Sequence, residues 1–80
     1  MPSIDVAVVS VHVTMNTVVW QIKRVAPGRP WIGWARGDGT FSPGVDPRAE
    51  VEGVEMFRTA QYAIEFAREQ GWNVVSVIER

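Results

Sequence analysis

The sequence predicts an α+β domain in which a small mixed or antiparallel sheet of about four strands carries one helix on one face. Two observations predict this class. Apolar residues recur at helical spacing in one segment near the C-terminal end, and β-branched or alternating apolar residues mark several extended segments. In chain order the expected elements are two strands, a long loop, a strand, the helix and a closing strand (β-β-loop-β-α-β).

The first two strands are expected to form a β-hairpin over residues 4–25. The segment from Ile4 to Val13 is almost entirely β-branched or small, and it is apolar on both faces, so it requires cover on both sides. Residues 14–16 (Thr-Met-Asn) supply a turn. The second strand alternates: the residues expected to face inward are Val18, Trp20 and Ile22, and those expected to face outward are Gln21 and Lys23.

Residues 26–47 are rich in proline and glycine, which predicts a long structured loop with a short extended piece over 31–35. Its aromatic residues Trp31, Trp34 and Phe41 are costly to leave in water, so they are expected to pack against the sheet or to bind something.

A strand, helix and strand are expected over residues 51–79. The first strand covers 51–57, and the second covers 74–78, where apolar residues on both sides predict a central position in the sheet. If both strands join one sheet in parallel, the crossover between them is right-handed. One helix covers one face only, so the other face needs the loop, a second copy or a partner.

The helix lies within residues 57–72, and both of its ends can be read. Thr59 is the expected N-cap, and Gly71 stands where a left-handed residue ends a helix without the steric cost of a Cβ. At about 100° per residue one arc is apolar, with Tyr62 at its edge. The residues expected to dock on the core are Ala63, Ile64, Phe66 and Ala67, with Trp72 sealing the C-terminal end.

Composition predicts a single domain over residues 1–80 that binds no cofactor and no metal. The chain has no cysteine, which excludes disulfides, thiolate metal sites and a cysteine nucleophile. Its one histidine, His12, lies in an apolar strand without companion ligands. There is neither a run of about 20 apolar residues nor a positively charged segment before an apolar stretch. We therefore expect a soluble, cytoplasmic protein.

Two patterns suggest chemistry, but each has a simpler explanation. The segment 33–39 (G-W-A-R-G-D-G) is rich in glycine like a phosphate loop, yet it matches neither the Walker nor the dinucleotide pattern. A tight turn that lets Trp34 fold back on the sheet is favoured. The carboxylate pairs Glu50/Glu52 and Glu65/Glu69 are expected on solvated surfaces, and no Ser–His–Asp set can be assembled. We therefore expect no enzymatic activity.

Five short stretches share their order and approximate spacing with a known family. They are Trp20-Gln21-Ile22, Pro30-Trp31-Ile32-Gly33-Trp34-Ala35 with Asp38, Phe57-Arg58-Thr59, Ala63-Ile64-Glu65-Phe66-Ala67 and Gly71-Trp72. Together they resemble the accessory iron–sulfur-protein-four subunit family of respiratory complex I (NADH:ubiquinone oxidoreductase). The resemblance implies the same fold and an accessory or assembly role near an oxidoreductase. The chain departs from mitochondrial members of that family in lacking their basic C-terminal tail, so we expect a stand-alone domain of a bacterium or a phage.

The sequence therefore predicts a non-catalytic protein-interaction module that binds a larger partner. This partner is a respiratory or other oxidoreductase complex or, for a phage-encoded chain, a host protein. The residues expected to contact a partner are Trp31, Trp34, Arg36, Val9 and Val11. The strand over 4–13 also favours self-association as a homodimer, through its edge or its apolar face.

A second hypothesis is a small protein that binds single-stranded nucleic acid. Trp31 and Trp34 would stack on bases, while Arg24, Arg29 and Arg36 would contact phosphates. The net charge of −1 weighs against it, because binding to a polyanion is driven by an excess of basic residues.

Overall fold

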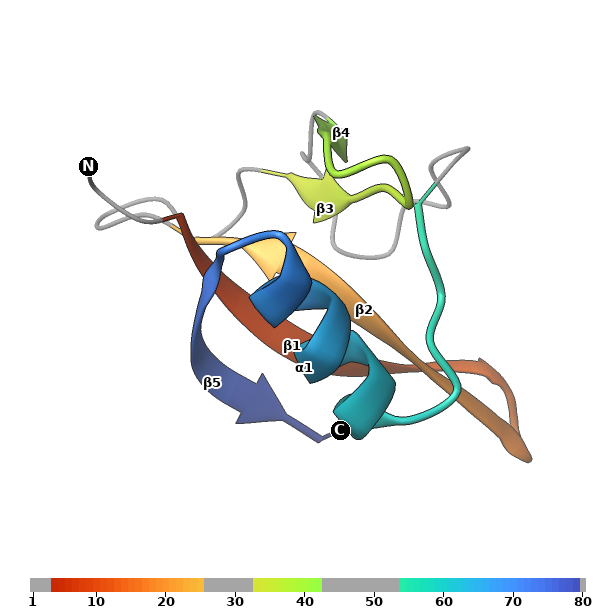
Figure 1. Ribbon diagram of the computed structural model, residues 1–80. Coiled ribbons are helices and arrows are strands. Elements are labelled where there is room, and N and C mark those ends of the chain that lie inside the picture. Colours follow the sequence, from red (N-terminus) through yellow and green to blue (C-terminus); the bar gives the residue numbers. More distant parts are fainter. Residues whose placement is uncertain (1–3, 26–32, 43–53, 80) are drawn as a thin grey trace.

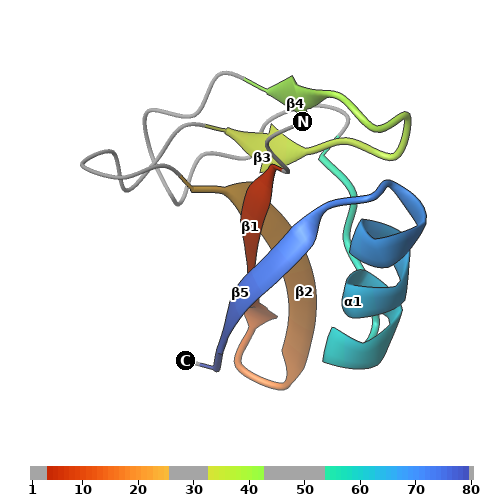
Figure 2. The same cartoon turned by 60° about the vertical axis from the view of Figure 1, so that its left-hand side comes forward.

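The computed structural model describes residues 4–25, 33–42 and 54–79. In chain order these residues form β1 (Asp5–Thr14), β2 (Thr17–Arg24), β3 (Trp34–Ala35), β4 (Phe41–Ser42), α1 (Ala60–Glu69) and β5 (Asn73–Ile78). The strands make one mixed sheet in the order β4-β3-β2-β1-β5, and α1 packs on one face of it (Figures 1 and 2). The α+β class is confirmed. The sheet has more strands than expected, because part of the predicted loop forms β3 and β4.

The predicted β-hairpin is confirmed. β1 and β2 pair antiparallel from Val6–Arg24 to Thr14–Thr17, so that Met15 and Asn16 form the turn. A register irregularity lies between His12 and Thr14.

The requirement for cover on both faces of β1 is met within one chain. Val6 and Val8 belong to the core cluster under α1, and the alternating residues Ala7 and Val9 point to the opposite face. All four side chains are buried. The apolar pattern over 4–13 therefore marks a strand that is buried on both sides at its first half.

The helix begins and ends where the sequence predicts. The Oγ1 atom of Thr59 accepts a hydrogen bond from the backbone N–H of Tyr62 at 3.2 Å, which satisfies one of the free donors of the first turn. Gly71 has φ of +80°, and its N–H donates to the carbonyl of Arg68 at 3.0 Å. Ala63 and Ala67 are fully buried, which confirms the face that docks.

A row of aromatic rings lies between α1 and the sheet. Phe57 and Phe66 have ring centroids 5.3 Å apart, Phe66 and Trp72 are 5.8 Å apart, and Trp72 and Phe41 are 4.7 Å apart. Tilted and edge-on ring pairs at these separations add about 0.5–1.5 kcal/mol each beyond the burial of their area. The row joins the start of the helix, its end and the β3–β4 hairpin into one core.

Two predictions about the sheet are wrong. β5 was expected at the centre, but among the described strands it lies at the edge and pairs with β1 alone, in parallel. The segment 51–57 was expected to be a strand that, if it joined the same sheet in parallel with β5, would be connected to it by a right-handed crossover. Residues 51–53 lie outside the described part, and 54–57 make only two isolated antiparallel bridges, Val54 to Arg36 and Phe57 to Trp20. The central position goes to β1 instead, because β1 is the strand whose two faces are both covered.

The outward position of Lys23 also needs correction. Lys23 does lie on the face opposite α1, where it pairs with Ala7 and Trp34, but it is buried and not solvated. Alternation placed Lys23 on the correct face of the sheet, but this second face is covered as well, so the side chain is buried.

Candidate functional site

The residues expected to bind a partner do not form one exposed surface. Val9 is 1% exposed and Trp34 is 3% exposed, so both are core residues within the single chain. Val11 and Arg36 are half-buried, and Trp31 lies outside the described residues. β1 is also an interior strand, with β2 on one side and β5 on the other from Asp5 to Val9, so its backbone edge is not free over these residues.

Trp34 is buried on the sheet face opposite α1. It pairs with Lys23, which pairs in turn with Ala7, and residues directly opposite each other on neighbouring strands share a face. Gly33 just before it is obligatory for packing: a Cβ there would lie 2.4 Å from the carbonyl oxygen of Ser42.

The glycine-rich segment 33–39 forms β3 and the turn that leads to β4. The N–H of Arg36 donates to the carbonyl of Thr40 at 2.8 Å, and the N–H of Gly39, where φ is +87°, donates to the carbonyl of Arg36 at 3.1 Å. The chain then continues into a strand and not into a helix N-terminus. The interpretation of this motif as a tight turn is confirmed.

Asp38 closes that turn with its carboxylate. The hydroxyl of Thr40 donates to Oδ1 of Asp38 at 2.6 Å, and the backbone N–H of Thr40 donates to the same atom at 2.9 Å. These two hydrogen bonds, that of the hydroxyl first, lower the pKa of Asp38 below its ordinary value. The carboxylate therefore stabilises this turn.

The stacking platform required for nucleic-acid binding is not found among the described residues. Trp34 and Trp72 are buried and Trp20 is half-buried, so none of these indoles presents a free face to a base. The guanidinium of Arg24 lies 5.7 Å from the ring centroid of Phe41, where it makes a cation–π contact within the chain.

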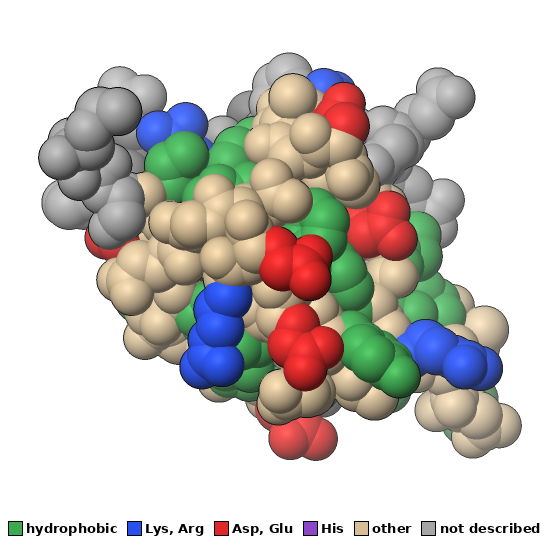
Figure 3. Space-filling model, viewed as in Figure 1, with side chains coloured by type: hydrophobic (Ala, Val, Ile, Leu, Met, Phe, Trp, Pro, Cys, Tyr) green, Lys and Arg blue, Asp and Glu red, His purple; other side chains and the backbone are tan. Residues whose placement is uncertain are grey.

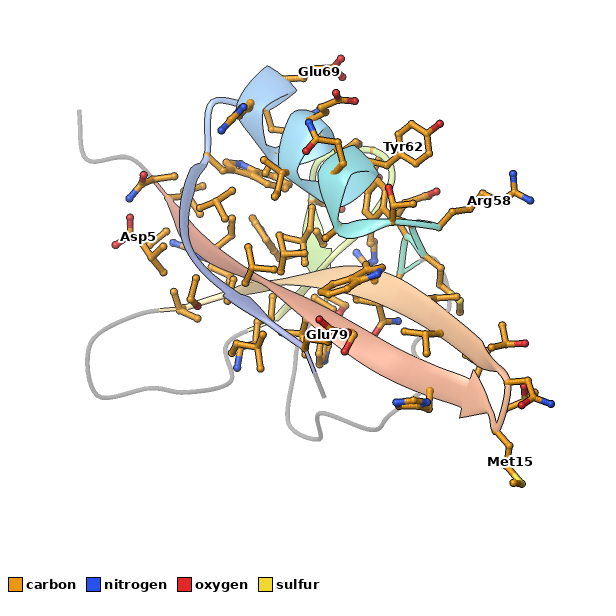
Figure 4. All side chains as sticks on the ribbon, turned by 90° about the horizontal axis from the view of Figure 1, so that it is seen from below. Asp5, Met15, Arg58, Tyr62, Glu69 and Glu79 are labelled. Atoms are coloured by element: carbon orange, nitrogen blue, oxygen red, sulfur yellow. The ribbon has the colours of Figure 1, made fainter. Side chains whose placement is uncertain are left out.

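Exposed apolar side chains lie instead in two places, on the end of the β1–β2 hairpin and around the start of α1. We call the two together the hairpin-end surface; its residues are Val13, Met15, Val18, Met56, Arg58 and Tyr62. Figures 1 and 2 both show the hairpin turn and the start of α1 at the same end. In Figure 4 the labelled side chains of Arg58 and Tyr62 project at the start of α1, and Met15 projects from the tip of the hairpin, well apart from them; Figure 3 shows hydrophobic and basic side chains side by side on this side of the molecule.

The geometry of the sheet explains why these side chains are exposed. β5 has its last paired residue, Ile78, opposite Val9, and the bridge to the segment before α1 is at Trp20. Beyond these points, β1 and β2 pair only with each other among the described residues. The end of the hairpin is thus a two-stranded ribbon without a core of its own, and Met15 at its tip is 96% exposed.

The composition of this surface fits protein recognition. Methionine, tyrosine and arginine are enriched in protein interfaces, and tyrosine and arginine are frequent hot spots. Tyr62 is 56% exposed in the first turn of α1, and Arg58 lies just before it. A flexible methionine at the tip adapts its shape to a partner at little cost.

Sequence reasoning missed this surface, although two signals were present. Tyr62 lies at the edge of the apolar arc of the helix, and Met15 is an apolar residue in a predicted turn, where polar residues are the rule. Both are apolar residues at positions that local structure places in water.

Other classes of site find no support in the described residues. These residues contain no group of three or more histidine, cysteine, aspartate or glutamate side chains that could hold a metal ion. None of their helices is long and apolar enough to cross a membrane. Comparisons of the chain with protein-family models, with curated proteins and with solved structures found no match.

Proposed function

We propose that this protein is a non-catalytic interaction module that binds a larger protein partner through the hairpin-end surface. One observation carries the proposal: exposed apolar residues and Arg58 lie at the start of α1 and on the hairpin that extends past the sheet, two segments that are distant in sequence. An exposed apolar group of this kind is costly to maintain in a domain of this size unless it is used.

The identity of the partner is part of the proposal. The resemblance to the accessory subunit family of complex I favours an oxidoreductase complex, which the module would join as an accessory or assembly subunit, without a cofactor of its own. In a phage-encoded chain the same surface would bind a host protein. In either case binding depends on the hairpin-end surface, and this dependence is what an experiment tests.

The test is affinity capture with matched variants, followed by mass spectrometry. The parent is compared with Met15→Lys/Tyr62→Lys and with Glu69→Lys, which places a lysine on an exposed residue at the end of α1, away from the hairpin and from β5. We expect a partner that is enriched by the parent and by Glu69→Lys, and lost with the double variant. Because all three positions are exposed, circular dichroism should show the same fold for each protein.

Two outcomes would contradict the proposal. Capture that the double variant retains would show that the hairpin-end surface is not the binding surface. Binding of single-stranded DNA or RNA that weakens steeply with salt would favour the nucleic-acid hypothesis, since contacts to phosphates depend on salt and contacts of this apolar surface do not.

A further inference from the structure

The outer edge of β5 is a strand edge that no other described strand pairs with. β5 is the last strand of the sheet, and its inner edge pairs with β1. Natural proteins protect such edges with lysine, proline, inward charges, β-bulges, a short strand or a covering element, and of these β5 has only the register shift opposite Val6 and Ala7 among the described residues. Residues 73–78 (N-V-V-S-V-I) contain neither charge nor proline, and the strand is six residues long.

Exposed apolar side chains of β5 flank this edge. Val75 is 52% exposed and Val77 is 49% exposed. Val77 pairs with Val8, a residue of the core under α1, so its side chain stands on the helix side of the sheet, next to the edge. Figures 1 and 2 show no described element beyond β5 on this side.

The sequence of the strand is symmetric about Ser76. Val74 and Val75 precede this serine and Val77 and Ile78 follow it, while the polar Asn73 and Glu79 stand at the two ends. If two copies of β5 pair antiparallel around a two-fold axis at Ser76, valine meets valine or isoleucine at every apolar position. Glu79 of one copy then meets the neutral Asn73 of the other. A parallel arrangement would instead place the two Glu79 carboxylates side by side, which is unfavourable.

We propose that the outer edge of β5 is a docking site for a second copy of this chain, which pairs its own β5 antiparallel about an axis at Ser76. The two sheets become one, the free backbone donors and acceptors of both edges are satisfied, and Val75 and Val77 of the two copies cover each other. This proposal goes beyond the partner surface proposed above and does not depend on it. It also replaces β1 as the strand through which the chain would self-associate.

The contact is expected to be weak. One strand pair with its flanking side chains belongs to the class of interfaces below about 1,200 Å², which is typical of transient association. The register shift of β5 between Val6 and Ala7 of β1 adds local twist at Val75 and so limits the length of regular pairing. We expect a dissociation constant between about 10 and 100 µM.

A disulfide at the axis is the most direct test, because the chain contains no cysteine of its own. Directly opposite residues of an antiparallel pair have Cα atoms about 4.5–5.5 Å apart, within the range of about 4.4–6.8 Å that a disulfide spans. The variant Ser76→Cys should therefore form a covalent dimer on mild oxidation. The control Met15→Cys places a thiol at a position that is 96% exposed, where only random collision brings two copies together.

Oxidation at about 20 µM protein should cross-link Ser76→Cys at least about tenfold faster than Met15→Cys, since pairing gives an effective thiol concentration in the millimolar range. Equal rates, or a faster reaction of the control, would overturn the proposal.

Analytical ultracentrifugation from 5 to 500 µM, that is over about two decades around the expected constant, supplies the second test. Val77→Lys should raise the dissociation constant at least about tenfold, whereas Val13→Lys, at a valine of similar exposure on the hairpin, should leave it unchanged. A parent that stays monomeric at 500 µM, or a dimer that Val13→Lys abolishes and Val77→Lys retains, contradicts the proposal. The cross-linking test does not depend on whether Val77→Lys folds.

Discussion

Gly33 should be one of the least replaceable residues of this chain, and Gly71 provides the comparison that isolates the reason. Both glycines have positive φ, +151° at Gly33 and +80° at Gly71, where a side chain strains the backbone. They differ in what a Cβ would meet. At Gly33 it would lie 2.4 Å from the carbonyl oxygen of Ser42 and 3.2 Å from Cβ of Phe41, whereas at Gly71 it would meet nothing within 4 Å.

The magnitude follows from these contacts. An ordinary C···O contact is about 3.3–3.6 Å, so Gly33→Ala requires a movement of about 1 Å in a backbone that pairs β3 with β4. Overpacking of this kind costs about 1–3 kcal/mol, and the backbone strain adds about 1–3 kcal/mol, which gives about 2–5 kcal/mol in total. Gly71→Ala carries the strain without the clash, and the stiffer unfolded chain offsets part of it, which leaves about 1 kcal/mol.

Urea denaturation followed by tryptophan fluorescence measures both changes. We expect a lower midpoint for each variant, with Gly33→Ala less stable than Gly71→Ala by at least about 1 kcal/mol and with similar slopes. The contact of Phe41 with Trp72, whose rings lie 4.7 Å apart, should be lost first in Gly33→Ala, because β4 carries Phe41. If the two variants are equally stable, the close approach of Gly33 to Ser42 does not exist in solution and the β3–β4 pairing is wrong.

Three further changes test other parts of the structure. Phe66→Ala should lower the free energy of unfolding by about 2–3 kcal/mol, somewhat less than for a fully buried phenylalanine, because Phe66 is half-buried between Phe57 and Trp72. The control Glu69→Ala, at a solvated residue, should change it by no more than about 0.5 kcal/mol, and an unchanged denaturation midpoint for Phe66→Ala would refute the docking of α1. The pKa of Asp38 is lowered in the folded protein, so the ionised carboxylate stabilises the fold fully above the ordinary pKa of about 3.9, and this contribution is lost as pH falls through the folded pKa. The difference in denaturation midpoint between the parent and Asp38→Asn should therefore shrink from about pH 7 to about pH 3. A constant difference would show that the hydrogen bonds from Thr40 do not form. Val9→Lys should unfold the chain, since Val9 is 1% exposed and an unpaired charge cannot remain there; a folded Val9→Lys with lost self-association would restore the hypothesis that β1 is an interaction strand.

Local signals made the helix predictable to its ends. Thr59, Gly71 and the apolar arc act within a few residues of one another, so each can be read from the sequence without knowledge of the rest of the fold. The hairpin was predictable for the same reason, because its two strands are joined by a two-residue turn at Met15 and Asn16.

The order of the strands was not predictable, because it depends on contacts between distant segments. The run 74–78 is apolar on both sides whether it lies in the middle of a sheet or at its edge. Its position is decided by its pairing with β1, which is distant in sequence: the hydrogen bond from Asn73 to Asp5 joins residues 68 positions apart. Likewise, nothing local shows that Gly33 approaches Ser42 and thereby turns a loop into two strands.

The same distinction explains the outcome for the candidate site. Trp34 and Val9 were selected because of residue type, yet residue type favours the core as strongly as it favours an interface, and the covered second face of the sheet buries both. What separates a binding residue from a core residue is exposure, which follows from where neighbouring strands end. β5 ends opposite Val9, and this leaves the hairpin beyond it uncovered.

The two proposed surfaces arise in different ways. Because β5 pairs with only the first half of β1, the second half of the hairpin extends past the sheet and exposes Val13, Met15 and Val18; the outer edge of β5 is open because no other described strand pairs with it. The hairpin-end surface and the β5 edge share no residue, and Figure 1 shows them on different sides of α1. A second copy paired at β5 therefore leaves Met15 and Tyr62 free, so a dimer would present two equivalent partner surfaces and would bind a repeated or symmetric partner with greater avidity than the monomer.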